Sequence, residues 1–78
     1  MKTYKLKTLP HFFNALSDGV KNFEIRKNDR DFHVGDTLHL EEWTPDAHYT
    51  GRMLVRIVIY ITAFAQQPGW IVMGLARD

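Results

Sequence analysis

The chain has 78 residues, ten of them basic and nine acidic, with a net charge of +1, 45% hydrophobic residues and no cysteine. A chain this short holds one hydrophobic core, so we expect residues 1–78 to form a single domain. The small net charge argues against a non-specific clamp on duplex DNA, which needs several phosphate-neutralising side chains on one face. The absence of cysteine excludes disulfides, thiolate metal sites and cysteine nucleophiles.

The first predicted elements are a strand and a helix. Residues Thr3 to Lys7 alternate between apolar and polar side chains, which indicates a half-buried strand. A helix should follow, with Thr8 as its N-cap, Pro10 in its first turn and Gly19 at its left-handed end.

The next predicted strand covers Lys21 to Lys27. Its apolar residues, Phe23 and Ile25, alternate with charged ones, so we expect both to lie in the core. Glu24 and Arg26 should then lie side by side on the opposite, accessible face.

The rest of the chain contains further turns and strands. We expect turns at Asn28–Asp31, Val34–Asp36 and Gln66–Gly69, a polar loop over Thr44–Gly51, and strands over Asp36–Trp43, Arg52–Thr62 and Trp70–Leu75. In the strand Asp36–Trp43 we expect Leu38 and Leu40 to point inward. The long strand is apolar on both faces, which is typical of a strand buried between two layers.

About five short strands and one early helix favour an α+β, mainly β fold. We expect a small β-barrel with one N-terminal helix, because closure of the sheet removes edges that so short a chain could not cover. A parallel α/β fold would need helical patterns after Gly19, and there are none.

The densest charge in the chain falls within eleven residues. These hold seven of the nineteen formal charges: Lys21, Glu24, Arg26, Lys27, Asp29, Arg30 and Asp31. One interpretation is a solvated network of ion pairs, each worth about 0–1 kcal/mol. The other is a binding site, in which carboxylate and guanidinium groups fixed on a strand bind a polar ligand.

The same stretch resembles a known family. The pattern Gly19-x-Lys21-x-x-Glu24-x-Arg26 is similar to the G-x-K-x-x-E-x-R signature of ASCH domains, which are members of the PUA-like superfamily. The longer block FEIRKNDRDF, followed by VGD, YTGR and FAQQPG, resembles a small group of ASCH-like proteins of bacteria and phages.

The resemblance implies a PUA-like barrel whose cleft, beside the signature, binds RNA or a modified nucleoside or nucleotide through Lys21, Glu24 and Arg26. There the carboxylate of Glu24 can hydrogen-bond a base edge and the guanidinium of Arg26 a phosphate. Further candidate ligand-binding residues are Lys27, Arg30, Tyr49 and Gln67, since cations attract phosphate, an aromatic ring can stack on a base and an amide can bond its edge. Trp70 opens an apolar strand, and we assign it to the core.

Two alternatives stay open. One ASCH group hydrolyses acylated cytidine with a lysine, a threonine nucleophile and a glutamate. Lys21 matches that lysine, but Glu24 stands where the threonine is expected, so a small amidohydrolase ranks below a binding domain. The third alternative is a protein-interaction module that docks a partner through the charged stretch.

No cofactor or metal is expected, because the four histidines lie in separate elements without ligand spacing. The N-terminus has no long apolar core and Arg56 interrupts the most apolar stretch, so we expect no membrane association and a cytoplasmic location. The sequence does not indicate the oligomeric state.

Overall fold

The computed structural model describes residues 1–78 as one curled β-sheet with one helix. The elements in chain order are β1 (Thr3–Thr8), α1 (Pro10–Ser17), β2 (Phe23–Lys27), β3 (Thr37–Thr44), β4 (His48–Thr62) and β5 (Trp70–Arg77). The predicted small, mainly β, barrel-like α+β fold with five strands and an N-terminal helix is therefore confirmed.

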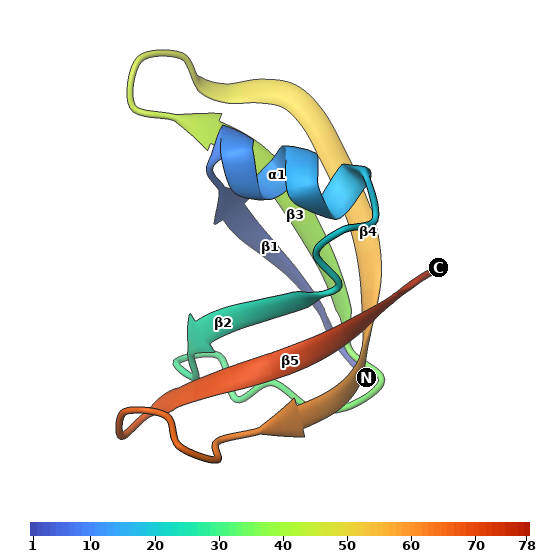
Figure 1. Ribbon diagram of the computed structural model, residues 1–78. Coiled ribbons are helices and arrows are strands. Elements are labelled where there is room, and N and C mark those ends of the chain that lie inside the picture. The colour runs from blue at the N-terminus through green and yellow to red at the C-terminus, as the bar shows by residue number, and fades with distance from the viewer.

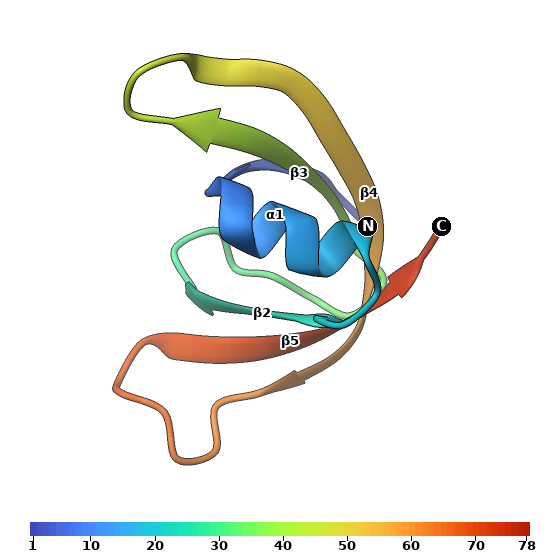
Figure 2. The same ribbon diagram turned by 45° about the horizontal axis from the view of Figure 1, so that its top comes forward.

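The strands lie in the order β1-β3-β4-β5-β2. Strands β1 and β3 are parallel, and the other three pairs are antiparallel. Strand β4 belongs to both halves of the sheet: residues His48–Ile57 pair with β3, and residues Arg56–Thr62 pair with β5. Figure 1 shows β4 running from the β1–β3 half to the β2–β5 half, and Figure 2 shows α1 inside the curl.

The core lies on the concave side of the sheet. Its nine buried residues come from every strand except β2, from α1 and from the loop before β3: Leu6, Leu16, Phe32, Leu38, Leu40, Val58, Ile71, Met73 and Leu75. The predicted inward pair Leu38 and Leu40 is confirmed, since both are fully buried. Alternate positions of β5 face this core, as expected for a strand with one covered face.

The sheet is a half-barrel, whereas we expected a closed barrel. Strands β1 and β2 are the two edges of the sheet and do not pair with each other. The prediction that β4 is buried on both faces is also wrong, because only Arg56 and Val58 of its fifteen residues are buried. An open sheet has one concave face to cover, and a single helix covers only that face.

The predicted loop over Thr44–Gly51 is mostly strand. Strand β3 runs to Thr44 and β4 starts at His48, so only residues 45–47 connect them. This hairpin extends beyond the body of the molecule (Figure 1), and every residue from Pro45 to Met53 is exposed. Both faces of the hairpin meet water, so its sequence carries no alternation of apolar and polar residues from which a strand could be recognised.

Helix α1 begins and ends differently from the prediction. Pro10 lies in the first turn and Gly19 adopts a φ of 80°, as expected, but the N-cap is Leu9 and no side chain caps the helix. The C-terminal end is bound by arginines from the sheet. Arg56 donates a 3.2 Å hydrogen bond to the carbonyl of Leu16, and Arg77 donates one of 3.3 Å to that of Ser17. Cations at this end also interact favourably with the helix dipole.

The loop before β3 is tied to the N-terminus by Asp36. This carboxylate accepts hydrogen bonds from the backbone amides of Lys2 (2.9 Å) and His33 (2.8 Å). Burial by itself raises the pKa of Asp36, but these two amides, with the positive charges of His33 and the N-terminus, outweigh burial and hold the pKa below 3.8.

The only helix, of eight residues, is too short to cross a membrane.

Candidate functional site

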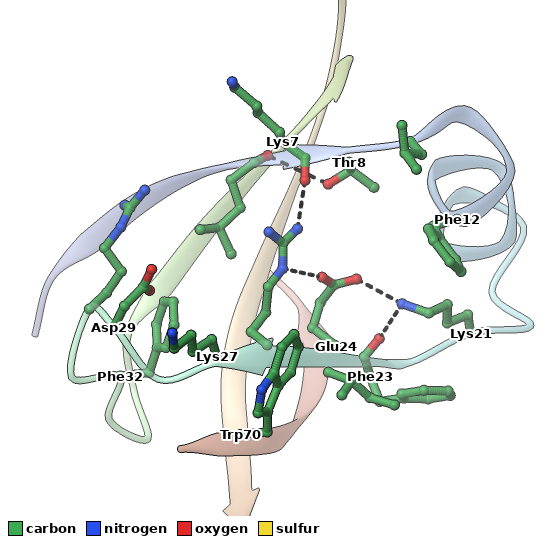
Figure 3. A pocket seen from close by; sticks show the side chains of 15 residues that line it. Lys7, Thr8, Phe12, Lys21, Phe23, Glu24, Lys27, Asp29, Phe32 and Trp70 are labelled. Carbon is green, nitrogen blue, oxygen red and sulfur yellow. Dashed lines mark hydrogen bonds and ion pairs between the residues drawn. The ribbon is translucent and has the colours of Figure 1, made fainter. Parts of the chain in front are cut away.

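A cleft of about 680 Å³ separates the two edge strands of the half-barrel. We call it the β1–β2 cleft. Figure 3 shows Lys7 and Thr8 of β1 on one side and Glu24 and Lys27 of β2 on the other. Its lining residues come from β1 and the residue after it, from α1, from the loops before and after β2, from β2 and from the start of β5: Leu6, Lys7, Thr8, Leu9, Phe12, Lys21, Phe23, Glu24, Ile25, Arg26, Lys27, Asp29, Arg30, Phe32 and Trp70.

Glu24 organises the cations of the cleft. Its side chain is only 5% exposed, and each carboxylate oxygen bonds one cation. Oε1 lies 2.7 Å from Lys21 Nζ, and Oε2 lies 2.9 Å from Arg26 Nε. A buried carboxylate requires such partners, because an unpaired charge away from water is very costly. Glu24 thus fixes both cations at the cleft.

The predicted faces of β2 are inverted. Glu24 is buried, whereas Phe23 is 40% and Ile25 50% exposed. The register with β5 decides the faces: Glu24 pairs with Met73 and Arg26 with Ile71, both of which point into the core side of the sheet. Cross-strand partners share a face of the sheet, so Glu24 and Arg26 lie on the same, core-facing side as their partners on β5.

Two features keep this ion-paired group in contact with solvent. The side chains of Lys21 and Arg26 are 16% and 27% exposed, and both residues line the cleft. The ion-paired group of Lys21, Glu24 and Arg26 is therefore not sealed in the core. Glu24 itself is buried, whereas we expected it to be accessible. Its role is to hold the cations, and the predicted contact between its carboxylate and a base edge is not retained.

Arg26 bridges the gap between the sheet edges. Its Nη2 donates a 2.6 Å hydrogen bond to the carbonyl oxygen of Lys7 on β1, while Nε is bound to Glu24. Nη1 makes no hydrogen bond within the chain and can still donate to a ligand. Lys21 Nζ bonds the carbonyl oxygen of Phe23 (2.8 Å) and Glu24, which leaves one of its three donor hydrogens.

The cleft concentrates positive charge and aromatic rings. Four basic side chains, those of Lys21, Arg26, Lys27 and Arg30, and two acidic ones line it, an excess of two positive charges in a chain whose net charge is +1. A fifth basic residue, Lys7, faces the cleft with its carbonyl oxygen, while its Nζ lies 4.8 Å from the ring centroid of Trp43 outside the cleft. Aromatic rings of Phe12, Phe23, Phe32 and Trp70 line the same space. Lys21 Nζ lies 4.9 Å from the ring of Phe23 and 5.4 Å from that of Phe12. The cleft therefore offers both anion-binding groups and flat apolar surfaces.

Five of the seven candidate residues come together at the cleft, namely Lys21, Glu24, Arg26, Lys27 and Arg30. The other two lie elsewhere. Tyr49 is on β4 and lines a separate hollow of about 430 Å³ beside β3. Gln67 is exposed in the turn between β4 and β5 and does not line the cleft.

Trp70 is the main lining residue that the sequence interpretation missed. We assigned it to the core, but it is 38% exposed and lines the cleft. It is the cross-strand partner of Lys27 and therefore shares the outer face of β2 and β5 with Phe23 and Ile25. Trp70 lies directly after the Pro68–Gly69 turn, at the end of a strand, and this position is the feature of the sequence that could have indicated its exposure.

The structure holds no group of three or more histidine, aspartate or glutamate side chains arranged to bind a metal ion. The only ring contacts of the histidines are with neighbouring aromatics, His11 with Phe12 at 3.9 Å and His48 with Trp43 at 6.1 Å.

Residues 3–75 match the model of a protein family described as a domain of unknown function, DUF3850, and the chain belongs to this family. The chain is also similar to a protein of Escherichia phage P2 described as an uncharacterized 12.9 kDa protein in the GpA 3′ region. The two are 34% identical over 70 residues, which is 90% of this chain and 61% of the phage protein. The chain thus spans about three-fifths of the length of that relative.

Proposed function

We propose that this member of the DUF3850 family binds single-stranded RNA or a nucleotide in the β1–β2 cleft. The observation that carries the proposal is the meeting of cations and aromatic rings in one concave site. Proteins that bind single strands combine a positively charged groove, which attracts the phosphates, with aromatic side chains on which the bases stack.

The arrangement of the charges supports a binding site over a surface network of ion pairs. Two of the four cations whose side chains line the cleft, Lys27 and Arg30, make no ion pair. Arg26 and Lys21 share the single carboxylate of Glu24 and keep free donors toward the cleft. An ion-pair network would match its charges, whereas this site has a surplus of positive ones.

The sequence resemblance points to the same site. Lys21, Glu24 and Arg26, which match the ASCH signature, lie together at the cleft. That the DUF3850 family is a branch of the PUA-like ASCH domains is part of our proposal and rests on this signature. A cytoplasmic location, predicted from the sequence, fits a ligand of this class.

Fluorescence anisotropy with a labelled RNA of about ten nucleotides, measured at several salt concentrations, tests the proposal. Arg30→Ala removes an unpaired cation of the cleft, and Lys5→Ala removes one from β1 outside the cleft. We expect Arg30→Ala to weaken binding of all RNA sequences alike and to reduce the salt slope by about one unit. Lys5→Ala should bind like the wild type.

A third variant addresses selectivity. Arg26→Ala should weaken binding by roughly 1.5–3 kcal/mol, the value of a hydrogen bond to a charged group, and should reduce selectivity among ligands. Thermal melts must show that each variant is folded. Absence of RNA and nucleotide binding at low salt would refute the proposal, and release of cytidine from acylated cytidine would replace binding by amide hydrolysis.

A further inference from the structure

We infer that the backbone N–H and C=O groups on the free edge of β2 form hydrogen bonds with the edge of an unpaired nucleobase. The ring of the base then lies in the plane of the sheet, between the side chains on one face of β2 and those on the other. The inference rests on the proposed function and names the part of the ligand that enters the cleft. It makes backbone groups, rather than the carboxylate of Glu24, the atoms that contact the base edge.

The hydrogen bonds at the two ends of β2 define which backbone groups are free. The amide of Leu75 donates to the carbonyl of Asn22 (2.9 Å), and the amide of Asn28 donates to the carbonyl of Gly69 (2.7 Å). Hydrogen-bonded and non-bonded pairs alternate along an antiparallel ladder. Ile25 is three residues from each end, so it forms a non-bonded pair with Val72, and its N–H and C=O point away from β5.

The cleft is lined by the edge of this strand. All five consecutive residues of β2, Phe23 to Lys27, line it. Successive side chains of a strand point to opposite faces, so a cavity over one face would meet only every second residue. A cavity that meets all five lies along the edge, where Ile25 presents one donor and one acceptor side by side.

A planar ring bonded to this edge would continue the plane of the sheet. On one side of that plane lie the apolar side chains of the outer face, Phe23, Ile25 and Trp70. On the other side lies the guanidinium of Arg26, which is planar and stacks well on flat rings. The four common nucleobases all carry a donor next to an acceptor, so each can bond an N–H and C=O pair.

The ends of the cleft favour a compact ligand over an extended peptide. At one end two contacts join the loop after β2 to β1. Tyr4 Oη donates a 2.9 Å hydrogen bond to the carbonyl oxygen of Arg30, and the ring centroids of Tyr4 and Phe32 lie 5.0 Å apart. At the other end stand Phe12 of α1 and Lys21. A peptide strand added to β2 would have to run through both ends, whereas a single base need not.

A pair of variants at one position separates the backbone from the side chain. Ile25→Pro removes the free N–H, and proline is tolerated on an edge strand whose N–H makes no ladder bond. Ile25→Ala keeps the N–H and removes most of the side chain. We expect Ile25→Pro to bind uridine 5′-monophosphate about tenfold more weakly than Ile25→Ala, which corresponds to about 1.4 kcal/mol.

A second measurement needs no variant. The 3-methyl derivative of uridine 5′-monophosphate lacks the N3–H donor and keeps the phosphate and the ring, so we expect it to bind the wild-type protein about tenfold more weakly than the parent. Equal affinities of the two ligands, or of folded Ile25→Pro and Ile25→Ala, would overturn the inference while leaving the proposed function in place. Failure of the wild type to bind any RNA or nucleotide would refute both. Tighter binding of an extended acidic peptide than of the nucleotide, lost in Ile25→Pro, would also overturn it, because the edge would then accept a strand.

Discussion

The buried carboxylate of Glu24 gives the sharpest test of how the cleft is built. Glu24→Gln keeps the size of the side chain but replaces one charged oxygen by an amide group that donates hydrogen bonds. One of the two cations, Lys21 or Arg26, then loses its acceptor and faces a donor. The variant therefore removes the charge that holds the two cations together at the cleft.

The expected loss of stability follows from burial and from the number of bonds. Removing one partner of a buried ion pair costs about 3–5 kcal/mol. The side chains of Lys21 and Arg26 are 16% and 27% exposed, so water offsets part of this cost. We expect a decrease of about 2–4 kcal/mol in the free energy of unfolding, out of a total of roughly 4–12 kcal/mol for a domain of this length.

Thermal unfolding followed by circular dichroism measures this decrease. For a domain of this size it corresponds to a fall in melting temperature of roughly 8–30 °C. Glu41→Gln is the matched control, since it makes the same charge change at a half-buried position of β3 without an ion pair. If both variants melt within about 2 or 3 °C of each other, Glu24 does not hold the cleft together and our account of its burial is wrong.

Three further predictions concern the ligand, the helix and acid stability. Trp70→Ala should weaken RNA binding by about 1–3 kcal/mol, the value of one stacked base, whereas Trp43→Phe, outside the cleft, should bind RNA normally in the same anisotropy assay. Arg56→Met removes one of the two donors to the carbonyl of Leu16, the other being the amide of Gly19 at 3.2 Å. It should lower the free energy of unfolding in urea by about 1.5–3 kcal/mol, the value of a hydrogen bond from a charged group; an unchanged urea midpoint would show that Arg56 does not anchor α1. The folded-state pKa of Asp36 lies below 3.8, so its contribution to stability is fully present above pH 3.8 and is lost as the pH falls through the folded-state pKa. Wild-type stability should thus fall more steeply with acid than that of Asp36→Asn, and equal slopes in urea titrations at about pH 2–5 would contradict this.

The sequence by itself determined the local structure of this protein. The alternation in β3 placed Leu38 and Leu40 in the core, and Pro10 and Gly19 marked the helix, because these signals depend on side-chain period and backbone freedom within a few residues. Charge density alone also led to the stretch that forms one wall of the cleft.

Only the tertiary structure decided which face of β2 is buried and what the cleft contains. The local pattern favours Phe23 and Ile25 as core residues, but pairing with β5 turns Glu24 inward, where Lys21 and Arg26 compensate its charge. The loss of solvation of an inward carboxylate is offset by partners that a strand pattern does not reveal. Trp70 reaches the cleft for the same reason: register with an edge strand, set by contacts distant in sequence, fixes which side of the sheet a residue occupies.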